Sequence, residues 1–269
     1  MTETAITERH PEGRIVVERR GPILLMGVDR VEKRNGFTPR MFRELGEAFT
    51  LLENAPDLFV GLLYAKGDHF SGGVDLPLMA EYRKAGSPYV PLNLVDPGQL
   101  REPYRTKPVV AAMQGICYTI AIELMLAADV VFAADNCRFS QLEVKRGIMP
   151  GYGGSFRFIE RAGWGNAMKW LLTGDEFDSA EALRLGLVQE VVPAGEQFER
   201  ALAYAQRVAE QAPLAVQGTI ENARLALGQG WMHAATHATA KNTFLYGTED
   251  AAEGRKSFAE KRTAKFVGR

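Results

Sequence analysis

The 269-residue sequence has few of the features that mark specialised classes of protein. It contains only two cysteines, Cys117 and Cys137, and no CxxC pair, which predicts neither a disulfide framework nor a cysteine-rich metal site. Such sparing use of cysteine is typical of a reducing compartment, so we expect a cytoplasmic protein. The net charge is only −1, because 32 basic residues are balanced by 33 acidic ones, and this balance argues against a nucleic-acid partner.

Long apolar runs are also missing. The most apolar stretch, residues 109–134, is interrupted by Gln114, Glu123 and Asp129, so its unbroken parts are too short to span a bilayer and we expect no membrane insertion. The first 14 residues are polar and have no apolar core after a basic start, which predicts no secretory signal. The GxGxxG and GxxxxGK[ST] phosphate loops and the GxSxG nucleophile elbow are absent as well.

Glycine, by contrast, is abundant. The chain has 27 glycines, about one residue in ten, where roughly 7% is typical. There is no Gly-X-Y period and only 13 prolines, so the sequence is neither collagen-like nor of low complexity. The excess therefore predicts either many tight turns or a backbone that comes close to a ligand.

The hydrophobic pattern predicts an α/β fold. Strand-like runs rich in Val, Ile and Leu alternate with helical patterns, and several lack polar alternation, which is typical of strands buried on both faces. Thr38 and Pro39 form a helix start before 40–53. The expected strands are 15–18, 23–28, 60–65, 109–113, 130–133 and 187–192; beyond Gly153, helices are expected at 154–162, 166–172, 179–185, 196–212, 214–227, 232–246 and 251–263. We expect an α/β core over 1–192 and a helical region over 193–269.

Two glutamates lie in informative surroundings. Glu123 lies within the apolar run Ile120–Ala128, where a carboxylate is costly unless it is paired or used. Glu143 follows a strand and opens a glycine-punctuated loop, where a surface residue paired with Lys145 or Arg146 is the simpler reading. A chain reversal at Val130–Ala133 and Asn136 can bring the two carboxylates together, and converging carboxylates can divide acid and base roles or hold one water.

Two turns are candidates for backbone hydrogen-bond donors. Gly72 and Gly73 allow a tight turn before the helix-like run Leu76–Arg83, so that the next amide, at Val74, can face outward. The Thr119-Ile120 amides begin the helix of Glu123 in the same way. Two convergent amides would form an oxyanion hole, although simple helix capping explains each turn equally well.

Three other features have weaker functional readings. The segment Ser87–Gly98 holds three prolines and is read as an irregular loop or a mobile lid. His233 and His237 are four residues apart on a predicted helix, but without a third ligand we expect an ordinary helix surface and no metal site. His69, alone before a glycine turn, is a weak ligand candidate.

Taken together, an ordered series of motifs resembles the enoyl-CoA hydratase/isomerase (crotonase) superfamily over about residues 16–266. The residues that carry the resemblance are the runs FSGGVDL at 70–76, KPVVAAMQG at 107–115, IEL at 122–124, AADVVFAA at 127–134, FSQLE at 139–143, GIMPGYGG at 147–154, LTG at 172–174, AEA at 180–182, GLV at 186–188 and EGRKSFAEKR at 253–262.

The resemblance implies a crotonase-like spiral of ββα units with a helical C-terminal trimerisation region, hence a homotrimer or a dimer of trimers. It implies acyl-CoA thioester substrates and no cofactor beyond the coenzyme A that the substrate carries, with no metal. By position, Glu123 and Glu143 match the two hydratase glutamates, and the amides of Val74 and Ile120 match the oxyanion hole. The further residues expected around the CoA thioester and the water site are Lys33, Arg34, Gly73, Gly151, Phe258 and Lys261.

On this resemblance the expected reaction is the addition of water across the double bond of a trans-2-enoyl-CoA, with Glu123 taking a proton from water and Glu143 delivering one to Cα. An isomerase that moves the double bond is the alternative; a dehalogenase, a thioester hydrolase and a non-catalytic acyl-CoA- or RNA-binding homologue are less favoured. Hydratases usually carry a glycine run where this chain has Thr119-Ile120-Ala121, and the β-branched Ile120 is expected to narrow the pocket.

Overall fold

The computed structural model describes residues 10–269, so the first nine residues of the polar N-terminal segment lie outside the described part. A six-stranded sheet forms its centre, in the order β1-β2-β3-β4-β6-β9. β1 is antiparallel to β2, and the remaining neighbours are parallel. The strands are β1 (Arg14–Arg20), β2 (Ile23–Asp29), β3 (Val60–Ala65), β4 (Val109–Met113), β6 (Val130–Ala134) and β9 (Glu190–Val192).

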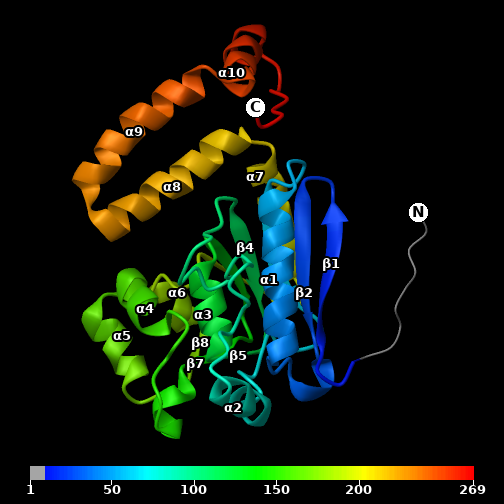
Figure 1. The fold of residues 1–269 in the computed structure, drawn as a ribbon, viewed down its shortest axis with the longest axis vertical. Coiled ribbons are helices and arrows are strands. Elements are labelled where there is room, and N and C mark those ends of the chain that lie inside the picture. The colour runs from blue at the N-terminus through cyan, green and yellow to red at the C-terminus, as the bar shows by residue number, and fades with distance from the viewer. Residues whose placement is uncertain (1–9) are drawn as a thin grey trace.

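Helices cover both faces of this sheet, which confirms the prediction of strands buried on two sides. In β2, Leu24 and Met26 face the core cluster that includes α1 (Pro39–Asn54), whereas Ile23 and Leu25 face α7 (Gln197–Ala209). α1 begins as predicted, because Thr38 Oγ1 accepts a hydrogen bond from the Met41 amide at 3.2 Å and a proline follows the cap. Figure 1 shows α1 lying along the sheet.

A second, small sheet carries much of the site-forming chain. It consists of β5 (Ile116–Tyr118), β7 (Arg138–Ser140) and β8 (Phe177–Asp178), with β5 and β7 parallel. Helix α3 (Ile120–Ala127) follows β5 after a single residue, and the 3₁₀ helix η2 (Leu142–Arg146) follows β7. The side-by-side pairing of β5 and β7 therefore places the starts of α3 and η2 next to each other.

The other helices are η1 (Val31–Lys33), α2 (Leu76–Lys84), α4 (Gly154–Ala162), α5 (Trp164–Leu171), α6 (Ser179–Arg184), α8 (Pro213–Gln229), α9 (Trp231–Tyr246) and α10 (Glu249–Glu260). In Figure 1, α8, α9 and α10 extend beyond one end of the α/β body, opposite the end that holds α2. α8 and α9 pack against each other, whereas α7 packs against β3, β4 and β6. Across residues 10–269, no helix is long and apolar enough to cross a membrane.

Most predicted elements differ from the observed ones by one or a few residues at their ends, and two of these differences have a clear local reason. The strand expected at 187–192 begins only at Glu190, because the amides of Leu187 and Val188 bond to the carbonyl of Ala182 and complete the turn after α6. The last helix ends at Glu260, since Lys261 adopts a left-handed backbone with φ 52°. The segment Ser87–Gly98 is irregular, as predicted, and buries Val90, Val95 and Asp96 against the body.

Candidate active site

One cavity of about 810 Å³ gathers most of the residues expected to act. Its walls come from the turn after β3, the start of α3, the η2 segment with the loop that follows, and α2. It is lined by Gly72, Gly73, Val74, Leu76, Arg83, Tyr89, Thr119, Ile120, Glu123, Leu142, Glu143, Val144, Arg146, Gly147, Ile148, Met149, Gly151 and Tyr152. Six of the predicted site residues, including both glutamates, therefore share one apolar-walled cavity.

Glu123 is buried, with 4% of its surface exposed. Its Oε1 accepts hydrogen bonds from two backbone amides, Tyr152 N at 2.6 Å and Gly154 N at 3.0 Å. Burial raises the pKa of Glu123, and the two amides and Arg157 oppose this shift. Gly154 fits because an added Cβ would lie 3.1 Å from Oε1 and 2.2 Å from Gln141 Nε2. One oxygen of Glu123 is thus held by the backbone.

Glu143 is also buried, which corrects the reading of it as a surface residue paired with Lys145 or Arg146. Lys145 pairs with Asp175 at 3.2 Å instead, and Glu143 lies in η2 rather than in an open loop. Within residues 10–269, no group hydrogen-bonds to the buried Oε2 of Glu143. Burial, with a smaller contribution from the charge of Glu123, raises the pKa of Glu143 to about 7, and a backbone hydrogen bond opposes the shift. This carboxyl group can therefore carry a proton near neutral pH.

The two predicted amide donors occupy strained or tight backbone. The turn before Val74 is held by Ser71, whose hydroxyl accepts a hydrogen bond from Gly73 N at 3.1 Å, and Gly73 has φ +114°. Thr119, the residue before Ile120, has φ 49° and ψ −108°, a conformation that side chains rarely adopt. In the described part of the chain, the amides of Val74 and Ile120 donate to no protein acceptor. Both N–H groups are available to a ligand.

The residues expected to contact CoA fall into two groups. Lys33 and Arg34 line a smaller cavity of about 310 Å³ that shares Gly72 and Val74 with the main one. Phe258 and Lys261, by contrast, are at α10 and its end, in the region that Figure 1 shows at the opposite end of the molecule from α2. Phe258 is 88% exposed. A single chain therefore does not bring these last two residues to the cavity.

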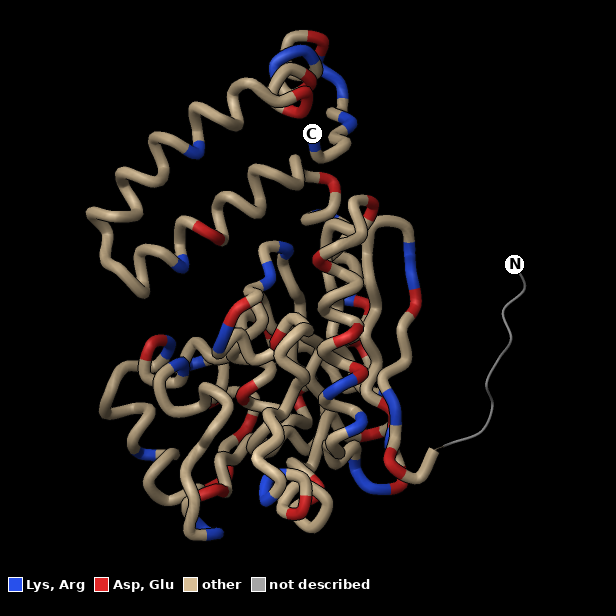
Figure 2. The backbone as a smooth tube through the Cα atoms, in the orientation of Figure 1, with Lys and Arg blue, Asp and Glu red and all other residues tan. Residues whose placement is uncertain are grey.

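The last residues of the chain are rich in Lys and Arg, with five such residues between 255 and 265. Figure 2 shows acidic residues among the Lys and Arg residues there. Arg262 pairs with Glu253 at 2.5 Å and with Glu260 at 2.6 Å, and Arg269 pairs with Glu249 at 3.0 Å. These arginines are already partnered within the chain.

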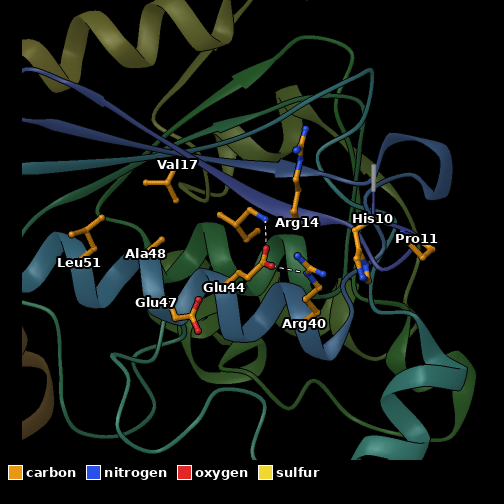
Figure 3. Close-up of a pocket in the computed structure, with 10 residues that line it drawn as sticks. His10, Pro11, Arg14, Val17, Arg40, Glu44, Glu47, Ala48 and Leu51 are labelled. Atoms are coloured by element: carbon orange, nitrogen blue, oxygen red, sulfur yellow. Dashed lines mark hydrogen bonds and ion pairs between the residues drawn. The ribbon is translucent and has the colours of Figure 1, made fainter. Parts of the chain in front are cut away.

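A groove of similar size, shown in Figure 3, lies between β1 and α1. Its central carboxylate, Glu44, accepts hydrogen bonds from Ile15 N at 2.8 Å and from Arg40 Nε at 2.7 Å. The Nδ1 of His10 accepts a hydrogen bond from the Glu12 amide at 3.1 Å. Because these polar groups already bond within the chain, the groove offers fewer polar groups to a ligand than the cavity of the two glutamates does.

His233 and His237 lie on α9, where His233 is exposed and His237 is half-buried, in keeping with the predicted helix surface. His237 contacts Glu221 and Asn222, each at 3.1 Å, and His233 contacts the Gln229 carbonyl at 3.0 Å. His69 Nδ1 accepts a hydrogen bond from the Ile116 amide at 3.2 Å. Among residues 10–269, no group of three or more His, Cys, Asp or Glu side chains could hold a metal ion.

The sequence did not predict the contacts of Tyr152 and Asp96. Tyr152 supplies an amide to Glu123, and its hydroxyl donates a hydrogen bond to Asp96, which lies 56 residues earlier. A backbone donor has no signature in residue type, and the partner of the hydroxyl lies in an irregular segment without periodicity. The available signal in the sequence was an aspartate in a turn-forming run, Asp96-Pro97-Gly98.

The chain is similar to known proteins over most of its length. The family described as enoyl-CoA hydratase/isomerase matches residues 18–269. The chain is 34% identical over 261 residues to 2,3-dehydroadipyl-CoA hydratase of Escherichia coli K12, covering 95% of this chain and 99% of that protein. It is 32% identical over 256 residues to carnitinyl-CoA dehydratase of Citrobacter koseri, covering 93% and 97%.

Solved structures are similar over the same length. The crystal structure of a probable enoyl-CoA hydratase/isomerase from Mycobacterium abscessus has a TM-score of 0.92 and 43% identity, and the match covers 95% of this chain and 98% of that one. That of enoyl-CoA hydratase from Mycobacterium tuberculosis H37Rv has a TM-score of 0.86 and 31% identity, covering 97% and 100%. The α/β core and helical C-terminal region are thus those of known crotonase folds, and the chain belongs to the enoyl-CoA hydratase/isomerase family.

Proposed function

We propose that this protein is an enoyl-CoA hydratase that adds water across the 2,3 double bond of a trans-2-enoyl-CoA to give a 3-hydroxyacyl-CoA. The observation that carries the proposal is that Glu123 and Glu143, both buried, share one cavity with the unpartnered amides of Val74 and Ile120. The hydratase and dehydratase names of the relatives support the same reaction type.

In this proposal the thioester carbonyl accepts hydrogen bonds from the Val74 and Ile120 amides. These donors stabilise the negative charge that develops on the oxygen as Cβ is attacked, and they are fixed before the reaction begins. The Gly72-Gly73 turn and the strained backbone of Thr119 hold these two amides in place. Lys33 and Arg34, in the adjoining cavity, would hold the anionic part of CoA, and Gly73 and Gly151 would let the backbone approach the thioester and the water.

The two glutamates divide the proton transfers. Glu123 keeps its charge better because two amides bind Oε1, so it accepts the proton of the attacking water while the water oxygen bonds to Cβ. Glu143, with a pKa of about 7, delivers a proton to Cα as the enolate collapses. The proton gained by Glu123 balances the one lost by Glu143, and once a proton passes back from Glu123 to Glu143, directly or through water, the net change is the addition of one water. No step in this scheme needs a metal or a redox cofactor.

A homotrimer or dimer of trimers is part of the proposal. Five large apolar side chains on or beside α8 and α9 are exposed in the single chain: Leu227, Trp231, Met232, Phe244 and Tyr246. Exposed apolar surface of this kind is typical of an interface. Such an assembly would allow Phe258 and Lys261 of one subunit to approach the CoA bound by another.

The two cysteines, Cys117 and Cys137, are buried free thiols, which fits the cytoplasmic location that we propose.

The proposal is tested by incubating the protein with enoyl-CoA thioesters of four to twelve acyl carbons in heavy-oxygen water. Labelled 3-hydroxyacyl-CoA supports hydration. A shifted double bond without label shows an isomerase, and bound but unchanged thioester shows a binding role; either result would overturn the proposal. The double variant Glu123→Gln/Glu143→Gln is the matched control and should bind CoA without turnover.

A further inference from the structure

A cluster of hydrogen bonds joins the irregular segment before β4 to the loop before α4, whose amides bind the carboxylate of Glu123. Asp96, which is 3% exposed, is at its centre. Its Oδ1 accepts hydrogen bonds from the Tyr152 hydroxyl and from the Gly98 amide, the latter at 3.1 Å. Its Oδ2 accepts one from the Leu100 amide at 3.1 Å. The carboxylate is thus satisfied by three donors, two of them from its own turn.

Tyr152 is held at both ends. Its ring is 5.3 Å from that of Tyr89 and 5.9 Å from that of Phe42, and its hydroxyl also accepts a hydrogen bond from the Gly98 amide at 3.2 Å. At the backbone end, its amide donates to Oε1 of Glu123 at 2.6 Å. The contact with the turn is close, since a Cβ on Gly98 would lie 2.4 Å from the ring of Tyr152. One residue therefore connects the Asp96 turn directly to the proposed base.

We propose that Asp96 is a positioning residue, which holds the Tyr152 side chain so that the Tyr152 amide stays on Oε1 of Glu123. This inference rests on the proposed function for its effect on turnover. Asp96 does not line the cavity and so does not touch the substrate. It acts through Tyr152: with the phenol fixed, the amide is pre-aligned and the second oxygen of Glu123 remains for the water. Fixed alignment of this kind is what a catalytic group requires.

The same segment has a second anchor that provides a matched control. The guanidinium of Arg101 donates hydrogen bonds to the carbonyls of Val90 at 2.9 Å and Pro91 at 2.8 Å. These bonds order the segment and, within residues 10–269, Arg101 makes no hydrogen bond to Tyr152; its charge is only the smallest of the influences on the pKa of the Tyr152 phenol. Loss of the Arg101 side chain should therefore loosen residues 90–94, whereas Asp96 keeps its own hydrogen bonds to Gly98, Leu100 and Tyr152, so the alignment of Glu123 should stay intact.

The test compares Asp96→Ala, Asp96→Asn, Tyr152→Phe and Arg101→Met in the full-length protein. Glu123 is titrated by carbon NMR of protein labelled in the glutamate carboxyl carbons, with its signal assigned by Glu123→Gln, so this measurement needs no substrate. Because a weaker hydrogen bond from the Tyr152 amide stabilises the carboxylate less, the measured pKa of Glu123 should rise by roughly one unit in Asp96→Ala and Tyr152→Phe. Asp96→Asn keeps a carbonyl acceptor and should restore most of the alignment, and Arg101→Met should titrate like the wild type.

Turnover of crotonyl-CoA provides the second measurement. kcat should fall about tenfold in Asp96→Ala and Tyr152→Phe, with KM unchanged, whereas Arg101→Met should keep the wild-type kcat. Wild-type titration and kcat in Tyr152→Phe would overturn the inference, even if Asp96→Ala failed to fold. An equal shift in Arg101→Met would also overturn it, because general loosening would then explain the effect. If the wild type hydrates no enoyl-CoA, the proposed function fails while the titration still decides whether Asp96 positions Glu123.

Discussion

Glu143 lies close enough to Glu123 for the charge of one carboxylate to raise the pKa of the other, in a site where burial already favours the neutral form. The two residues are 20 positions apart and reach the same cavity because β5 and β7 lie side by side. Glu123 has two amide donors on Oε1, whereas the buried Oε2 of Glu143 has no partner within residues 10–269. Two residues of the same type thus have different environments, which is what separate acid and base roles require.

The first prediction is that Glu123→Gln and Glu143→Gln each abolish hydration of crotonyl-CoA. General acid–base groups contribute about 10²- to 10⁴-fold, so kcat should fall by at least roughly that factor in each variant. Binding of CoA should persist, because the amide donors and the Lys33 and Arg34 cavity are untouched. Stopped-flow absorbance measures the first quantity and calorimetry with CoA the second. Wild-type turnover in either variant contradicts the two-carboxylate mechanism.

The second prediction concerns the dependence of hydration on pH. Glu143 must be protonated to deliver its proton, and its pKa is about 7, so the hydration rate should decline as pH rises through this value. Hydration rates measured from pH 5 to 9 should therefore fall on the alkaline side, near pH 7, as Glu143 loses its proton. They should also fall on the acidic side, where Glu123 becomes protonated and can no longer act as the base. Because the two groups interact, these two declines describe the pair. A rate that stays constant from pH 6 to 9 would contradict the role given to Glu143.

The third prediction links the same group to stability. The folded-state pKa of Glu143, about 7, is above its ordinary 4.5, so the folded protein binds more protons than the unfolded chain between these values. Stability should be highest below pH 4.5 as far as this group is concerned and should be lost as pH rises to about 7. Glu143→Gln removes this loss and should be more stable than wild type at pH 8 by about 1–3 kcal/mol.

Urea unfolding at pH 5 and pH 8 measures this effect. The gap between variant and wild type should be small at pH 5 and larger at pH 8. An equal gap at both pH values would show that Glu143 does not titrate as proposed. Exposed Glu47, paired with Arg43 at 3.8 Å on the surface of α1, provides a control. The free energy of unfolding of Glu47→Gln should differ little from that of the wild type at either pH.

Much of the fold could be predicted because strong local signals coincide with tertiary demands. β3 and β4 have the predicted ends, since an apolar run between breaks fits a strand buried on both faces. The Thr38 cap fixes the start of α1. The strands of the small sheet are only two or three residues long, which is too short for any period to show, and yet this sheet aligns α3 with η2.

The site was predictable to a similar extent. Glu123 could be identified from its surroundings, because a charge within an apolar helix is costly. Glu143 is surrounded by ordinary polar residues, so only the resemblance to a family indicated a function for it. The Tyr152 amide could not be predicted, because every residue except proline carries one. Phe258 and Lys261 are distant within one chain, and their proposed role needs a contact between subunits that a single sequence does not describe.

The fourth prediction separates two neighbouring glycines. Gly73→Ala should lower kcat strongly, because Gly73 has φ +114° and the new Cβ would lie 2.9 Å from Thr119 Oγ1, which would displace the Val74 amide. The loss of one oxyanion donor costs about 10²- to 10³-fold. Gly72→Ala should be mild, since its nearest contact is an ordinary 3.5 Å from Arg34. Steady-state kinetics measures kcat of both variants, and an equal loss of kcat in the two would contradict the proposed importance of the backbone at Gly73.

The fifth prediction concerns Thr119, which has φ 49° and ψ −108° where relatives were expected to carry glycine. A side chain in such a conformation costs about 1–3 kcal/mol. Thr119→Gly should remove this strain, offset in part by about 0.4–1 kcal/mol of extra chain entropy in the unfolded state, so we expect a net gain of about 1 kcal/mol. Thr119→Ala keeps a Cβ and should gain nothing. Urea unfolding of both variants decides the matter: if the alanine variant is as stable as the glycine variant, the backbone at Thr119 is not strained, and another cause must hold the Ile120 amide in place.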